Sequence, residues 1–277
     1  MNSLAQPDPP LLISTVAAAL GDLACRFDVD VVGECDSTNA RLLERAEIGA
    51  PSGSVLAALY QTAGRGRRGR QWLSMPHDSL TFSLLWRFPP DTPLAGLSLA
   101  VGVALAQTLE GLGIPGVALK WPNDVLLNER KLAGVLIELV PGKMPQAAVI
   151  GIGMNLKLPR EMPLELQKTA ASLAESGLPL PSASVLLARV LTSLHATLTT
   201  FSAAGFAQLR EEWLMRHAFQ DRAVRLLSDF DAPLEGRVIG IDDDGALLLE
   251  TAAGTQRIIS GEVSLRAAVS QAERVAS

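Results

Sequence analysis

Seven short runs rich in β-branched and other apolar residues follow one another between residues 28 and 156. This series of runs limits the possible folds more than any other feature of the sequence. They are residues 29–33, 54–60, 79–88, 117–121, 124–127, 131–140 and 147–156. Runs of this length, bounded by turn-forming residues, are typical of strands. Residues 37–39 are expected to cap a helix over 40–48, and 94–112 predicts a long apolar helix behind the strands. The pattern predicts a mixed core built on one substantial sheet.

The rest of the chain flanks this core. Ser14 is expected to cap a short helix over 15–26, and helical periodicity returns over 184–201 and 206–217. Five short strands follow, at residues 223–228, 236–241, 246–250, 256–260 and 262–265. These patterns predict an N-terminal extension over 1–27, a large mixed domain over 28–219 and a small barrel-like domain over 220–277.

Composition narrows the class of protein. The net charge is −5, which argues against a surface tuned as a whole to polyanions, so any anion site must be local. Cys25 and Cys35 are the two cysteines and lack metal-type spacing, which fits a reducing compartment. The apolar stretch 11–20 lacks a preceding basic region and meets neither signal-peptide nor membrane-span criteria. We therefore expect a cytoplasmic protein.

The segment that most indicates chemistry is 61–72, where three glycines alternate with four arginines directly after a predicted strand. Glycines let backbone N–H groups approach an anion closely, and arginine offers planar forks that suit phosphate or carboxylate. Such a loop can enclose an activated acyl phosphate. A nucleic-acid or localisation patch is the alternative, because short arginine-rich runs are common and this pattern is not a Walker loop.

A second segment, 120–134, combines cations with hard oxygen ligands around one predicted hairpin. Lys120, Asn123, Asp124 and Lys131 are the residue types that an ATP reaction needs for Mg²⁺ and phosphate charge. An Asn-Asp turn flanked by solvated lysines is the alternative interpretation.

A third segment, 149–156, is a buried strand that carries two glycines and ends with an amide side chain. Glycine inside a strand often marks the close approach of another group. The dinucleotide-binding fingerprint is matched only loosely, because its third glycine and its following helix are missing.

In this order, segments 36–39, 64–70, 120–124, 130–134 and 151–155 resemble the signature of biotin protein ligases, the BirA family. The similarity runs from about residue 29 to residue 266. It implies an α+β fold, with a mixed sheet and helices like the core of class II aminoacyl-tRNA synthetases and biotin/lipoate ligases, plus a small C-terminal SH3-like β-barrel. It also implies that ATP and biotin, with Mg²⁺, give biotinyl-5'-AMP, and that a carrier lysine then attacks this mixed anhydride.

The resemblance also implies residue roles. The biotin-binding residues would be Ser37, Thr38, Asn39, Gln61, Gly64, Arg65, Gly66, Arg67, Lys131 and Gly134. The ATP-binding residues would be Arg67, Arg68, Trp72, Lys120, Asn123, Asp124, Lys131, Asn155 and Arg266. Lys131 would be the main catalytic cation and Arg67 would hold the intermediate, while Asn123 and Asp124 would serve the metal. Cys25, Cys35, His77, His195 and His217 match no motif and are expected in packing or at the surface.

The implied partner is a biotin carboxyl carrier protein of a biotin-dependent carboxylase. Some family members carry an N-terminal winged helix-turn-helix, whereas about thirty residues precede this core, so we expect no DNA binding. Because stretch 11–20 does not meet the membrane-span criteria, we expect no membrane binding either. A homodimer is left open. Lipoate-protein ligases share the fold and the adenylate strategy, but their motifs differ from 64–70 and 120–124. A nucleic-acid-binding protein is the rival of another class, and the acidic charge weighs against it.

Overall fold

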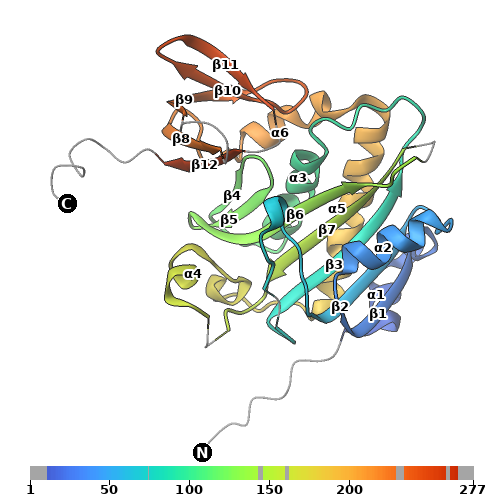
Figure 1. The fold of residues 1–277 in the computed structure, drawn as a ribbon. Helices are drawn as coiled ribbons and strands as arrows, with labels where there is room; N and C mark the ends of the chain where they lie inside the picture. Colours follow the sequence, from blue (N-terminus) through green and yellow to red (C-terminus); the bar gives the residue numbers. More distant parts are fainter. Residues whose placement is uncertain are drawn as a thin grey trace, which may run out of the picture.

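A seven-stranded mixed sheet forms the centre of the molecule. The computed structural model describes residues 11–73, 75–142, 146–159, 162–228, 234–259 and 263–267. The strands of the large sheet are β1 Asp28–Cys35, β2 Ser54–Gln61, β3 Ser79–Arg87, β4 Val117–Lys120, β5 Asp124–Leu127, β6 Arg130–Leu139 and β7 Ala147–Asn155. Their order is β1-β2-β3-β7-β6-β5-β4, and only β1 and β2 pair in parallel (Figure 1). The predicted mixed sheet is confirmed.

Three helices pack behind this sheet: α1 Ile13–Leu20, α3 Leu97–Gly111 and α5 Ala183–Ala204 (Figure 1). Eleven of the fifteen residues of α3 are buried, which explains why its sequence is apolar on every face. By length and composition α5 could also cross a membrane, but ten of its residues are buried inside this fold. Packing therefore accounts for its apolar character.

The predicted helix over 15–26 is divided in two by Gly21. This glycine has φ +56°, which ends α1, and the chain continues as the 3₁₀ segment η1 Gly21–Arg26. A left-handed backbone is easily adopted by glycine and stops an α-helix.

On the opposite face of the sheet lies α2 Thr38–Glu47, which packs against β2, β3 and β7 (Figure 1). Ser37 caps it, because the Ser37 hydroxyl accepts a hydrogen bond from the Ala40 N–H at 3.5 Å. The apolar side of α2 buries Leu42 and Ala46 in a small cluster with Val149 of β7. This packing holds residues 37–39 against the front of the sheet.

The C-terminal region forms a second, smaller sheet. Its strands are β8 Ala223–Ser228, β9 Leu234–Ile241, β10 Leu247–Thr251, β11 Gly254–Ile258 and β12 Val263–Ala267. All neighbours pair antiparallel in the order β11-β10-β9-β8-β12, consistent with the SH3-like fold that was expected.

The helix predicted over 206–217 is shorter than expected. It begins as the 3₁₀ segment η4 Phe206–Leu209 and ends as α6 Arg210–Leu214. Leu119 of β4 donates its N–H to the Arg216 carbonyl at 2.7 Å and accepts the Ala218 N–H at 2.9 Å. These bonds use backbone groups that a continued helix would need for its own hydrogen bonds, so tertiary pairing overrides the helical period.

The small sheet is fastened to the core at Trp121. This side chain is fully buried, and its indole N–H donates to the Gly245 carbonyl at 3.0 Å. Gly245 has φ +79°, and a Cβ there would lie 2.7 Å from the Leu99 side chain and 3.0 Å from Gly96 Cα. The turn around Gly245 therefore needs glycine for both conformation and space.

Candidate active site

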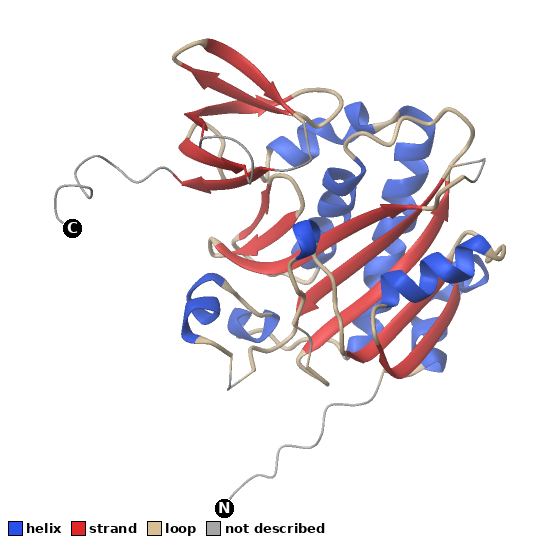
Figure 2. Cartoon of the chain, in the orientation of Figure 1, coloured by secondary structure: helices blue, strands red, loops and turns tan. Residues whose placement is uncertain are grey.

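A cavity of about 530 Å³ opens on the front face of the large sheet, between α2, the β4–β5 hairpin and the loop that joins β2 to β3. That loop crosses in front of the sheet and carries a short turn, η2 Arg67–Gly69 (Figure 2). Most of the residues singled out in the sequence line this one space. They are Ser37, Thr38, Asn39, Gln61, Arg65, Gly66, Arg67, Arg68, Trp72, Lys120, Asn123, Asp124, Lys131 and Gly134.

At the α2 end, buried polar side chains are hydrogen-bonded to one another. Thr38 donates both its N–H and its hydroxyl to Gln61 Oε1, at 2.7 and 3.1 Å. The Ser83 hydroxyl lies 2.7 Å from Thr38 Oγ1 and 2.5 Å from Asn39 Oδ1. All four residues are at most 7% exposed. Buried groups paired in this way hold fixed orientations, which suits recognition of a polar ring.

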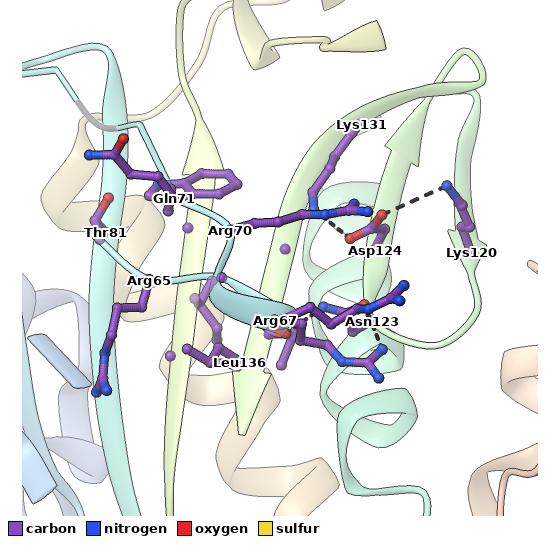
Figure 3. Close-up of a pocket in the computed structure, with 18 of the residues that line it drawn as sticks. Arg65, Arg67, Arg70, Gln71, Thr81, Lys120, Asn123, Asp124, Lys131 and Leu136 are labelled. Carbon is purple, nitrogen blue, oxygen red and sulfur yellow. Dashed lines mark hydrogen bonds and ion pairs between the residues drawn. The ribbon is translucent and has the colours of Figure 1, made fainter. Parts of the chain in front are cut away.

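Glu138 of β6 links this network to the loop. Its Oε2 accepts from Asn39 Nδ2 at 2.8 Å and forms an ion pair with Arg65 Nη2 at 3.0 Å. Arg65 points away from the other labelled cations of the cavity (Figure 3). The pair ties the start of the loop across the face of the sheet. The sequence analysis did not single out Glu138. It is a lone carboxylate within a largely apolar predicted strand, and that feature could have identified it as a candidate site residue.

The glycines of the central strands allow other groups to lie directly on the sheet. A Cβ on Gly151 would be 2.2 Å from Asn39 Oδ1, and one on Gly153 would be 2.2 Å from the Trp72 ring. Gly134 is opposite Gly153 in the adjacent strand β6. These strand glycines thus serve close approach of side chains, as the sequence indicated.

The base of the loop is closed by its own backbone. Gly64 accepts the Trp72 N–H at 2.9 Å, and Gly66 donates to the Arg70 carbonyl at 2.7 Å. Gly64 was expected to contact biotin, but it does not line the cavity. A Cβ at this position would lie 2.4 Å from the Trp72 carbonyl oxygen. Its role in this structure is to bring the two ends of the loop together.

Cations surround a single carboxylate at the other end of the cavity. Asp124 Oδ1 lies 2.6 Å from Lys131 Nζ, and Asp124 Oδ2 lies 4.0 Å from Lys120 Nζ (Figure 3). Arg67, which comes from the loop between β2 and β3, donates from its Nη1 to Asn123 Oδ1 at 3.3 Å. Three cations against one carboxylate leave this end positively charged, which suits phosphate groups.

The Arg67 guanidinium is partly removed from solvent by the cavity wall. Burial lowers the pKa of its guanidinium, and Arg68 and Arg70 lower it further, whereas Asp124 raises it. An arginine stays charged under such conditions, so its desolvated charge is available to an anion in the cavity.

The Trp72 indole forms a flat wall between the two ends. Its ring lies 5.9 Å from Lys131 Nζ, within cation–π range. Its Nε1 is buried without a hydrogen-bond partner among the described residues. The arrangement offers an aromatic face to a planar ligand beside the cationic end.

Besides Gly64, the predicted ligand residue Asn155 does not line the cavity. Asn155 is buried, and its amide donates to the carbonyl oxygens of Ala171 at 3.0 Å and Lys131 at 3.5 Å. Arg266 lies in β12 opposite Arg225, and its side chain is outside the part that the structure describes. The sequence analysis did not anticipate Arg70, Gln71, Glu129 and Arg130, which do line it.

The expected metal ligands are one carboxylate and one amide. Among the described residues there is no group of three or more His, Cys, Asp or Glu side chains placed to hold a metal ion. Asp124 and Asn123 offer hard oxygen atoms, the type that Mg²⁺ prefers when it arrives with phosphate.

Comparison with known proteins decides the family. Residues 32–155 match the Biotin/lipoate A/B protein ligase family, and residues 221–266 match the Biotin protein ligase C terminal domain. The bifunctional ligase/repressor BirA of Escherichia coli is 41% identical over 244 residues, covering 87% of this chain and 74% of that protein. The chain belongs to the biotin protein ligase family.

Two further relatives of this ligase match along almost their whole length. The biotin--[acetyl-CoA-carboxylase] ligase of Paracoccus denitrificans is 37% identical, over 84% of this chain and 98% of its own. The biotin protein ligase of Aquifex aeolicus, solved with biotin and ATP, aligns with a TM-score of 0.75 and 33% identity, over 87% of this chain and 99% of its own. The lipoate-ligase alternative is not favoured, because these relatives are biotin ligases.

Proposed function

We propose that this ligase joins biotin to ATP as biotinyl-5'-AMP in the front cavity and passes the biotin to a lysine of a biotin carboxyl carrier protein in the cytoplasm. One observation carries the proposal. The cavity joins a buried polar network suited to a small uncharged ring with a cationic end suited to phosphate, so both substrates meet in one space.

The biotin ring is assigned to the α2 end. Ser37, Thr38, Asn39 and Gln61 offer hydroxyl and amide groups there, and all are nearly fully buried. A ureido ring can exchange hydrogen bonds with these groups, whereas the dithiolane ring of lipoate has no comparable donors or acceptors, which favours biotin. The valeryl chain of biotin would then run through the cavity from the α2 end toward Lys131.

Lys131 is assigned the main catalytic role. Its Nζ is held by Asp124 at 2.6 Å at the cationic end. Attack of the biotin carboxylate on the ATP α-phosphate builds negative charge on the phosphoryl oxygens, and a fixed cation stabilises that charge. Arg67, positioned by Asn123, is assigned to hold the adenylate until the carrier lysine attacks.

The adenine is assigned to the Trp72 wall, beside Lys131. Mg²⁺ would enter with the ATP phosphates, and Asn123 and Asp124 are the residues that would hold it. The ion would neutralise phosphate charge. Because Asp124 is paired with Lys131 here, the two lysines and the metal would share this carboxylate.

The test is pyrophosphate release by the full chain with ATP and Mg²⁺, with biotin or lipoate as the acid. Biotin should support release and lipoate should not, and a biotin carboxyl carrier protein should then become labelled at one lysine. Equal release with both acids would refute the substrate assignment. Release with biotin but no carrier labelling would refute the transfer step.

A further inference from the structure

A short helix, α4 Leu164–Thr169, borders the cavity next to the catalytic lysine. The segment after it is attached to β6: the Ala171 N–H donates to the Lys131 carbonyl at 2.8 Å, and Ala170 pairs with Lys131 as an isolated bridge. Arg130 also donates to the Ala170 carbonyl at 3.1 Å. The end of α4 is therefore fixed beside the reacting end of the cavity.

Lys168, on the last turn of α4, lines this cavity. It is one of only five lysines in the chain, against nineteen arginines. Lys120 and Lys131 face the same cavity, but both lie against the carboxylate of Asp124. Lys168 is thus the cavity lysine that Asp124 does not hold.

The Lys168 amine is free to move. Its side chain is 69% exposed, and its ion pair at 2.8 Å is with Glu165, whose side chain is 84% exposed. Exposed pairs of this kind contribute about 0–1 kcal/mol, so the amine leaves the carboxylate readily.

The Lys168 side chain borders the same cavity as the cationic end. Bridged backbones lie about 4.8 Å apart, and the two residues from Ala170 back to Lys168 span at most about 7 Å. The flexible four-carbon stem of lysine extends the reach toward Lys131. Lys168 and Lys131 thus line the same cavity from neighbouring backbone segments, and the Lys168 stem can swing toward an activated carbonyl held there.

We propose that Lys168 is a self-biotinylation site. This proposal rests on the proposed function, because the acyl donor is the biotinyl-5'-AMP made in the same cavity. The deprotonated Nζ attacks the carbonyl carbon of the mixed anhydride and forms a C–N bond. The bond from that carbon to the phosphate oxygen breaks, AMP leaves with the electron pair, and the nitrogen loses a proton to solvent. No other reactant is needed.

The reaction is intramolecular and competes with the carrier protein. An amine attached to the rim of the cavity has a high effective concentration there, whereas the carrier lysine must first diffuse in. Modification of Lys168 would replace a cation with a neutral amide and leave biotin attached at the cavity mouth.

The test uses the full chain with biotin, ATP and Mg²⁺ but without carrier, followed by peptide mass spectrometry. Lys157, which is exposed and lies outside this cavity, is the internal comparison. Because of tethering, biotin on Lys168 should exceed biotin on Lys157 by roughly tenfold. The fraction labelled per molecule should not change when the protein is diluted.

Lys168→Arg should remove most of the label, normalised to the biotinyl-5'-AMP formed in the same sample, while the matched Lys157→Arg variant should keep it. Equal labelling of Lys157 and Lys168, or labelling that falls on dilution, would overturn the proposal in favour of attack by released adenylate. Adenylate without any label on Lys168 would also overturn it. Absence of adenylate would instead contradict the proposed function.

Discussion

His217 should make the stability of this ligase depend on pH below neutrality. The residue lies in the turn between α6 and β8, 8% exposed, with its ring 4.4 Å from the Trp213 ring and its backbone bridged to Leu119. Burial lowers its pKa from 6.5 to about 4, and the neighbouring Gln220 and Asp221 offset this only in part. The ring is therefore neutral in the folded protein at pH 7.

The sign follows from which state binds the proton. The unfolded chain binds it near pH 6.5 and the folded protein only near pH 4, so acid favours the unfolded chain between these values. Stability is complete above about pH 6.5, falls through this window and levels off below it. Each pH unit of the window is worth ~1.4 kcal/mol, so the full loss is on the order of 3 kcal/mol, with most of it reached by pH 5.

Urea unfolding at pH 7.5 and pH 5 measures this loss. Other groups also titrate, so the informative quantity is the difference between the parent and His217→Phe, which keeps an aromatic ring beside Trp213 but cannot be protonated. The parent should lose about 2 kcal/mol more than the variant between the two pH values. If both proteins lose the same free energy of unfolding, the buried neutral histidine is not the cause.

Three further predictions concern the cavity. Lys131→Met should slow pyrophosphate release by roughly 10²–10³-fold, while calorimetry should find biotin affinity within about tenfold of the parent; unchanged release would remove Lys131 from the mechanism. Glu138→Gln frees Arg65 and should speed biotin dissociation about severalfold with no fall in melting temperature, and an unchanged off-rate would contradict the tie across the sheet. Gly153→Ala pushes a methyl group into the Trp72 ring and should raise the KM for ATP by roughly tenfold with biotin affinity preserved; an equal loss for both substrates would place the indole elsewhere.

The positions of the strands along the chain, and the motifs that follow them, could be predicted from the sequence, because strand character is largely local. The side chains that form hydrogen bonds with the motif residues could not be predicted. Asn39 is held by Ser83 of β3 and Glu138 of β6, two strands that β7 separates in the sheet. Which side chains meet across three strands depends on register, and register is set by tertiary packing.

The positions of Gly64 and Asn155 also could not be predicted from the sequence. Both belong to motifs, but in the fold one closes the loop and the other fastens the segment after α4 to Lys131. A motif identifies residues that the site needs. It does not say whether a residue contacts the ligand itself or holds another residue that does. The helix predicted over 206–217 ends early for a related reason. Backbone groups of residues 216 and 218 form hydrogen bonds with Leu119, which lies almost a hundred residues earlier in the chain.

The indole of Trp121 sits inside the joint with the small sheet, while its neighbours Lys120 and Asn123 face the cavity. The two parts of this ligase are therefore not exchangeable modules. A chimera that takes the small sheet from a relative would also have to take a turn with a carbonyl at the Gly245 position and a glycine able to adopt its left-handed backbone. Without that turn, the graft would leave a buried N–H unpaired next to Lys120, so exchange of the small sheet should succeed only when donor and recipient agree at this contact.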